Sequence, residues 1–184
     1  IPVAAFFLGD ESVGRKRAEE SLVHLVFGDS PPSFNLATFT AADGAERAVE
    51  VARTVPMMAK HRVVIVRNME SAGVKLLDDL LQYIEKPNPS TVLILNGQKH
   101  PGAVGGVDRG RRLEGAIKKV GRVERFKVSE QDPIRFALCH AEEAGCSCDH
   151  AAARMLVELV GSDLSRIQTE MDKVIAYSHG APRI

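Results

Sequence analysis

Short runs of apolar and β-branched residues constrain the fold of this chain more than any other feature. The clearest runs cover residues 3–8, 63–66 and 91–95, and each is followed by a polar residue or a glycine. A strand with one face in water alternates apolar and polar residues, whereas a strand covered on both faces is apolar throughout. The runs therefore predict central strands of a parallel sheet that helices cover on both sides.

Amphipathic helical patterns separate these runs, at residues 15–26, 45–55 and 74–84. Two weaker strand patterns, at residues 35–40 and 122–128, raise the expected number of strands to five. The predicted fold class is α/β, with a five-stranded parallel sheet flanked by helices. Right-handed crossovers then leave few possible topologies.

The pattern changes in the last third of the chain, where only helices are predicted. They cover residues 131–144, about 149–160 and about 162–177. We therefore expect two domains, an α/β domain over residues 1–128 and a three-helix domain over residues 129–184.

Three details of the helical part are specific expectations. Ser162 should cap the third helix, because serine is a favoured N-cap residue. The last residues, 181–184, have no polar tail or terminal cap, which favours a fragment of a longer chain. The second helix should bury one apolar face, which consists of Ala152, Met155, Leu156 and Leu159.

Composition narrows the functional classes. Apolar residues make up 45% of the chain and charged residues 26%, which excludes a disordered chain. The longest apolar run, residues 3–8, is too short to cross a membrane and lacks the flanks of a signal peptide. Three cysteines are too few for a disulfide framework, so we expect reduced thiols and a cytoplasmic protein.

The 24 basic and 24 acidic residues balance, but they are not evenly distributed. Residues 99–127 contain nine basic and three acidic side chains, a local charge of +6. Such a segment is typical of a surface that binds DNA phosphates without reading sequence, and a merely solvated basic face fits it equally well. A DNA-binding module is therefore one candidate function. Its candidate contacts are Arg109, Arg111, Arg112, Lys118 and Lys119.

A nearly complete phosphate-binding loop follows the first predicted strand. The P-loop pattern is G-x-x-x-x-G-K-[ST] between a strand and a helix, and Gly9 and Gly14 have its spacing. The chemically active positions differ. Arg15 stands where the phosphate-binding lysine belongs, and Lys16 replaces the hydroxyl that holds magnesium.

Further substitutions in the same region point the same way. Asp10 and Glu11 place two negative charges in a loop that would receive a triphosphate. Arg67 and Asn68 follow the strand at residues 63–66, where P-loop ATPases place an acid that orders magnesium. We therefore expect a vestigial nucleotide site, with no catalytic residue and no cofactor. A site that binds nucleotide without hydrolysis and an active ATPase are the alternatives.

Five segments, in order, carry a resemblance that covers nearly the whole chain. They are residues 7–11 (FLGDE), 52–59 (ARTVPMMA), 62–68 (RVVIVRN), 87–95 (PNPSTVLIL) and 159–166 (LVGSDLSR). Together they resemble the delta subunit of the bacterial DNA polymerase III clamp loader. Two positions depart from that family. A leucine–phenylalanine pair is common where this chain has Met57 and Met58, and most members lack a glycine at position 14.

The resemblance implies an AAA+-type fold without ATPase chemistry of its own, in a component of the DNA polymerase III holoenzyme. It implies that the subunit binds the ring-shaped sliding clamp, the beta subunit, and opens it for loading onto primer–template DNA. Other clamp-loader subunits would assemble with it in the bacterial cytoplasm, through a C-terminal collar domain that we expect to be absent from this chain. An active or nucleotide-binding ATPase of AAA+ type is the alternative.

Met57 and Met58, with Pro56 before them, are the candidate clamp contacts in this resemblance. Large apolar side chains at a helix end can protrude, and the flexible thioether of methionine fills a partner's pocket well. The pattern alone favours packing of one or both side chains beneath the next strand. The resemblance favours the clamp contact.

Other residues with binding chemistry give weaker signals. Asn96 and Arg166 stand where related ATPases place nucleotide-sensing residues, and we expect Arg166 to make an interdomain or partner ion pair instead. Several possible zinc ligands lie close together without the spacing of paired zinc knuckles, so no metal site is predicted. They are Cys139, His140, Cys146, Cys148 and His150.

Overall fold

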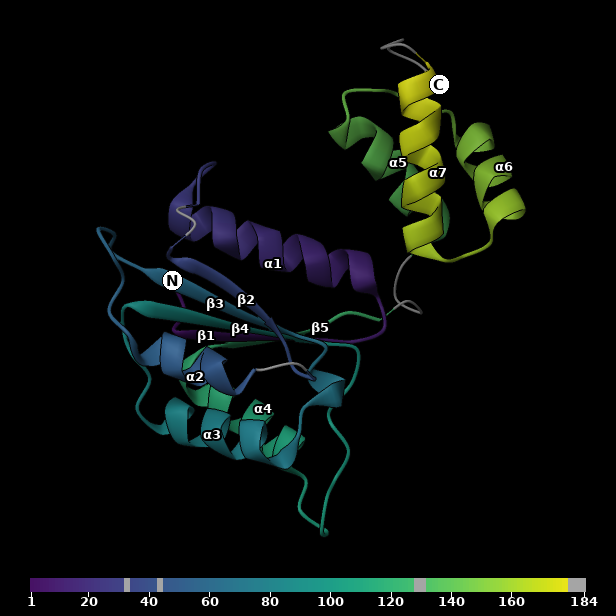
Figure 1. The fold of residues 1–184 in the computed structure, drawn as a ribbon. Coiled ribbons are helices and arrows are strands. Elements are labelled where there is room, and N and C mark those ends of the chain that lie inside the picture. The colour runs from purple at the N-terminus through teal and green to yellow at the C-terminus, as the bar shows by residue number, and fades with distance from the viewer. Residues whose placement is uncertain (32–33, 43–44, 128–131, 179–184) are drawn as a thin grey trace. The chain divides into compact units, whose positions relative to one another are not determined.

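The computed structural model of the chain describes residues 1–31, 34–42, 45–127 and 132–178. The chain divides into two compact units, Ile1–Phe126 and Lys127–Ile184 (Figure 1). Some predicted features lie outside the described residues. They are the ends of a strand at Val128 and of a helix at Gln131, and the chain end at residues 181–184.

The first unit contains a sheet of five parallel strands in the order β2-β3-β4-β1-β5, so the predicted sheet is confirmed. The strands are β1 (Ala4–Leu8), β2 (Leu36–Thr40), β3 (Arg62–Arg67), β4 (Thr91–Gly97) and β5 (Arg122–Arg125). The helices are α1 (Ser12–Phe27), α2 (Glu46–Arg53), α3 (Val74–Glu85) and α4 (Arg109–Val120), with a 3-10 turn, η1 (Met69–Ser71), after β3.

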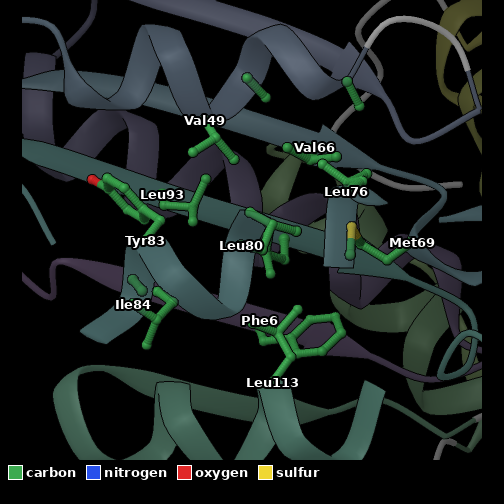
Figure 2. Packing of buried hydrophobic residues seen from close by; sticks show 14 of the residues in the cluster. Phe6, Val49, Val66, Met69, Leu76, Leu80, Tyr83, Ile84, Leu93 and Leu113 are labelled. Atoms are coloured by element: carbon green, nitrogen blue, oxygen red, sulfur yellow. The ribbon is translucent and has the colours of Figure 1, made fainter. Parts of the chain in front are cut away.

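Helices cover both faces of this sheet, which explains why its central strands are apolar throughout. Ala4, Phe6 and Leu8 of β1 point into the core beneath α2, α3 and α4. Ala5 and Phe7 point to the opposite face, which α1 covers. Figure 2 shows Phe6 beside Leu80 of α3 and Leu113 of α4 in the larger cluster. The period-2 alternation therefore fills two cores from one strand.

All five strands run in the same direction, so the sheet has two distinct edges. The carboxyl edge consists of the segments after the strands, whose described residues are 9–11, 41–42, 45, 68–73, 98–108 and 126–127. The amino edge consists of the segments before them, whose described residues are 1–3, 28–31, 34–35, 54–61, 86–90 and 121. Ligands of open α/β sheets bind at the carboxyl edge, so the degenerate loop lies where a nucleotide would.

The second unit consists of α5 (Pro133–Glu143), α6 (His150–Val160) and α7 (Leu164–Tyr177). Its three helices confirm the predicted pattern, although two details were wrong. Asp163, not Ser162, caps α7, because its carboxylate accepts from the backbone N–H of Ser165 at 2.9 Å. The expected core face of α6 is largely exposed, with Leu159 79% accessible, because α6 buries Ala153 instead.

None of the described helices is long and apolar enough to span a bilayer.

Candidate functional site

The loop after β1 is filled by one of its own side chains. Glu11 is buried, and its carboxylate oxygens accept from the backbone N–H groups of Val13 and Gly14, each at 2.7 Å. Backbone N–H groups at this position, at the start of a helix, are the groups that hold phosphate in a P-loop. The Glu11 carboxylate thus occupies the place of a phosphate oxygen.

The two loop glycines serve this arrangement. A Cβ at position 14 would overlap the Glu11 carboxylate, and a Cβ at position 9 would overlap the carbonyl oxygen of Phe126. Gly9 also has a φ of 133°, which side-chain-bearing residues rarely adopt. The spacing that resembles a P-loop therefore has a local explanation that involves no nucleotide.

A polar network closes the space behind the loop. Arg15 donates to the side-chain oxygen of Asn96, and the Asn96 amide donates to buried Glu19 at 3.0 Å. Arg67 Nε donates to the same carboxylate at 3.1 Å. The hydrogen bond to Glu19 raises the pKa of Arg67, so its positive charge is fixed.

This network determines what the magnesium position contains. Arg67, at the end of β3, directs its guanidinium toward Glu19. A cavity of about 230 Å³ remains, lined by the cations Arg15, Lys16 and Arg67. The one carboxylate in its lining, Glu19, is engaged by Arg67 and Asn96. The predicted position therefore holds a cation, which repels a divalent metal.

A second ion-pair cluster also ties segments of the carboxyl edge together. Glu114 of α4 is buried and accepts from Lys118 at 2.7 Å, Arg125 at 2.8 Å and His100 at 2.7 Å. Burial opposes ionisation of Glu114, but the hydrogen bonds from Lys118, Arg125 and His100 lower its pKa to about 2. Sequence reasoning missed this carboxylate because two of its three partners, His100 and Arg125, come from other segments and are brought to it only by the fold.

The structure divides the five candidate DNA contacts into two groups. Arg109 pairs with Asp78 at 2.7 Å, Arg111 with Asp108 at 3.3 Å, and Lys118 with Glu114. Within the described part of the chain, Arg112 and Lys119 have no such partner. They line a shallow groove of about 510 Å³ between α3 and α4. DNA contact by these residues stays a prediction.

The amino edge presents apolar side chains to solvent. Met58 is fully exposed, Met57 is 59% exposed and Val55 is 76% exposed. Pro56, between them, is partly buried. Packing of one or both methionines beneath the next strand, the alternative that the pattern alone favoured, is therefore wrong.

The backbone under these side chains is held from several directions. The helix before it, α2, ends at Arg53, two residues earlier than expected, and the Thr54 hydroxyl donates to the carbonyl oxygen of Val51 at 2.7 Å. The Asn35 amide donates to the Met57 carbonyl oxygen at 2.7 Å and accepts from the Met57 N–H at 2.8 Å. Arg62 donates to the Val55 carbonyl oxygen at 3.3 Å.

Met58 has an uncommon backbone conformation. Its φ is 52°, in the left-handed region that glycine and asparagine tolerate and most side chains avoid. The side chain gains no burial in compensation, because it is fully exposed. A methionine at this position therefore costs the isolated chain stability.

The remaining candidates lie in the helical unit. Arg166 is exposed on the first turn of α7, and its interdomain or partner role stays a prediction. Cys146 is buried, Cys139 is exposed, and His140 pairs with Asp172 at 2.6 Å. Across residues 1–31, 34–42, 45–127 and 132–178, no group of three His, Cys, Asp or Glu side chains is placed to hold a metal ion.

The structure is similar to several solved clamp-loader and motor proteins. The Bacillus subtilis DNA clamp loader delta protein matches with a TM-score of 0.67 and 24% identity, over 100% of this chain and 56% of that one. A DNA polymerase III gamma subunit-related protein of Thermotoga maritima matches with a TM-score of 0.60 and 17% identity, over 94% and 53%. The Thermotoga maritima RuvB Holliday junction branch migration motor gives 0.56 and 12%, over 98% and 57%. These likenesses show an AAA+-type fold.

Sequence comparison gives the family. A curated relative, DNA polymerase III subunit delta of Bacillus subtilis strain 168, is 28% identical over 181 residues, which cover 93% of this chain and 49% of the relative. The chain thus spans about half the length of the relatives it matches. The family model for the DNA polymerase III delta subunit matches residues 6–103, more than half of the chain. The chain therefore belongs to the DNA polymerase III delta subunit family.

Proposed function

We propose that this chain is the sliding-clamp-binding part of a clamp-loader subunit, and that Met57 and Met58 make the contact. In this proposal the subunit opens the ring-shaped clamp for loading onto primer–template DNA during replication. It acts in the cytoplasm, in a hetero-oligomer with other clamp-loader subunits, and it has no catalytic site of its own.

The observation that carries the proposal is the pairing of exposure with a fixed backbone at Met57 and Met58. Two large apolar side chains stand in solvent on a segment held by hydrogen bonds from Asn35 and Arg62. A preorganised segment binds with a smaller loss of conformational entropy than a mobile one. Burial of both side chains in a partner would contribute about 3–6 kcal/mol, which is enough for a binding hot spot.

The carboxyl edge supports the non-catalytic part of the proposal. The loop amides bind Glu11, and Arg67 occupies the position where an acid would order magnesium. Clamp opening by this subunit would then depend on ATP that other subunits bind. The alternative, an ATPase in this chain, finds no support in this geometry.

Calorimetric titration with the sliding clamp of the same organism tests the proposal. We expect submicromolar binding by the chain, and a loss of at least about a hundredfold in the double variant Met57→Ser/Met58→Ser. The double variant Met155→Ser/Leu159→Ser is the matched control, because it removes two exposed apolar side chains from the other unit. Its affinity should equal that of the unmodified chain.

Two outcomes would contradict the proposal. One is the absence of binding by the folded, unmodified chain. The other is an equal loss of affinity in both double variants, which would mean that exposed apolar surface of any kind adheres to the clamp.

A further inference from the structure

We propose that Asn35 is a positioning residue for the clamp contact, which fixes the Met57–Met58 segment in its binding conformation before the clamp arrives. This inference rests on the proposed function of that segment. Asn35 itself would not touch the clamp, because its side chain is fully buried.

The geometry assigns the Asn35 amide to the backbone of Met57. Its Nδ2 donates to the Met57 carbonyl oxygen at 2.7 Å, and its Oδ1 accepts from the Met57 N–H at 2.8 Å. Both bonds thus act on one residue of the exposed segment. A planar amide that satisfies a donor and an acceptor of one residue fixes both the position and the orientation of that residue.

Asn35 is itself bonded to the sheet. Asn35 directly precedes β2, and its carbonyl oxygen accepts from the Val63 N–H of β3 at 2.8 Å. The Asn35–Met57 pair therefore connects the sheet to a segment whose methionine side chains are exposed to solvent. A buried asparagine whose amide both donates and accepts a hydrogen bond costs less to desolvate than an unpaired one, which explains its tolerance at this position.

The backbone of Met58 gives an independent reason why the segment needs the two Asn35 hydrogen bonds. Its left-handed φ of 52° is unfavourable for a side-chain-bearing residue, so an untethered segment would leave this conformation. The two Asn35 bonds act on the residue immediately before it. With those bonds removed, we expect Met57 and Met58 to sample many orientations, and the clamp would have to order them on binding.

The test is clamp affinity in Asn35→Leu and Asn35→Ser, with folding followed by circular dichroism. We expect both folded variants to bind the clamp about ten- to a hundredfold more weakly, with a more unfavourable binding entropy. Thr91→Val is the matched control. It removes a buried side-chain hydrogen bond at the same edge, Thr91 Oγ1 to the Ala52 carbonyl oxygen at 2.9 Å, without touching Met57. Its affinity should be unchanged.

A double-mutant cycle separates positioning from general structure. Asn35→Ser should weaken binding in the unmodified chain and have no further effect in the Met57→Ser/Met58→Ser background, because there is no side chain left to position. Equal effects of Asn35→Ser in both backgrounds would overturn the inference.

Failure of the inference can be told apart from failure of the proposed function. If the Met57→Ser/Met58→Ser variant binds the clamp normally, the proposed function is wrong and the inference falls with it. If that variant loses binding but Asn35→Leu and Asn35→Ser keep it, only the inference is wrong. Should neither Asn35 variant fold, hydrogen exchange of the Met57 amide in the unmodified chain decides. Slow exchange of the Met57 amide supports the positioning role of Asn35, and exchange at the rate of an open loop overturns it.

Discussion

The two edges of the sheet differ in whether their functional side chains pair within the chain or are exposed to solvent. At the carboxyl edge, charged side chains and loop amides bind one another, as in the Glu11 cap and the Arg67–Glu19 pair. At the amino edge, Met57 and Met58 point into solvent from a backbone that the chain holds in place.

This difference supports the proposal that a partner binds at the amino edge. Loop amides and carboxylates that already bind one another gain little from a ligand, because its binding must first break those contacts. A fixed segment with exposed apolar side chains gains from being covered. In the proposed function, the carboxyl edge therefore has a structural role and the amino edge meets the partner.

The largest expected effect is a loss of fold stability at low pH, through the ion pairs of Glu114 at the carboxyl edge. The pKa of Glu114 is about 2, below its ordinary value of 4.5, so its ion pairs stabilise the fold above about pH 4.5 and are lost as the pH falls toward 2. The shift corresponds to at most about 3 kcal/mol. Urea unfolding at pH 6 and pH 3 should show this dependence in the unmodified chain and a smaller one in Glu114→Gln. Identical pH dependence in both would contradict the assignment.

Removal of the buried Glu19 carboxylate should have the next largest effect. We expect Glu19→Ala to lower the free energy of unfolding by about 2–3 kcal/mol, because the Asn96 amide and the Arg67 guanidinium lose their acceptor. The control is Glu20→Ala, which removes an exposed pair with Lys16 and should cost less than about 0.5 kcal/mol. Urea unfolding measures both. Because Glu19 lies at the carboxyl edge and the proposed contact at the amino edge, the folded Glu19→Ala variant should keep its affinity for the sliding clamp.

The Glu11 cap should have a smaller effect. Glu11→Ala is expected to destabilise the fold by about 1–2 kcal/mol, as the loss of a helix N-cap does, while Glu11→Gln keeps one acceptor and should cost less. Thermal unfolding with and without Mg-ATP checks this. Neither variant should gain from the nucleotide, because Arg67 still stands in the magnesium position. Stabilisation of Glu11→Ala by several degrees would mean that the loop retains nucleotide binding.

The smallest expected effect has the opposite sign. Met58→Gly should stabilise the chain by about 0.5 kcal/mol, because glycine adopts the left-handed conformation without strain. Met57 lacks a positive φ, so Met57→Gly should instead cost about 0.5–1 kcal/mol. Both variants should bind the clamp more weakly in a titration. Destabilisation by Met58→Gly equal to that by Met57→Gly would remove the argument from backbone strain.

Local sequence patterns predicted the parts of this molecule that depend on local physics. The apolar runs identified the three central strands, β1, β3 and β4, because a strand covered on both faces needs apolar residues at every position, whereas β2 and β5 at the two sides of the sheet gave weaker patterns. The missing lysine and acid of the nucleotide site were also visible, since a P-loop places them at fixed offsets.

Features that depend on contacts between distant segments were not predicted. Asn35 lies 22 residues before its partner Met57, and its sequence context gives no sign of the pairing. The pattern of α6 predicted an amphipathic helix, but it could not show that Ala153, rather than Leu159, would meet the neighbouring helices. The hydrogen bonds from the loop amides to Glu11 were not predicted, because a charged residue in a loop is expected to be exposed until the loop geometry is known.

A clamp titration carried out with and without Mg-ATP tests the contrast between the edges most directly. We predict the same submicromolar dissociation constant in both conditions, because in the proposed function the sliding clamp binds at the amino edge and the carboxyl edge takes no nucleotide. Binding that appears only with Mg-ATP, or that changes severalfold on its addition, would contradict it.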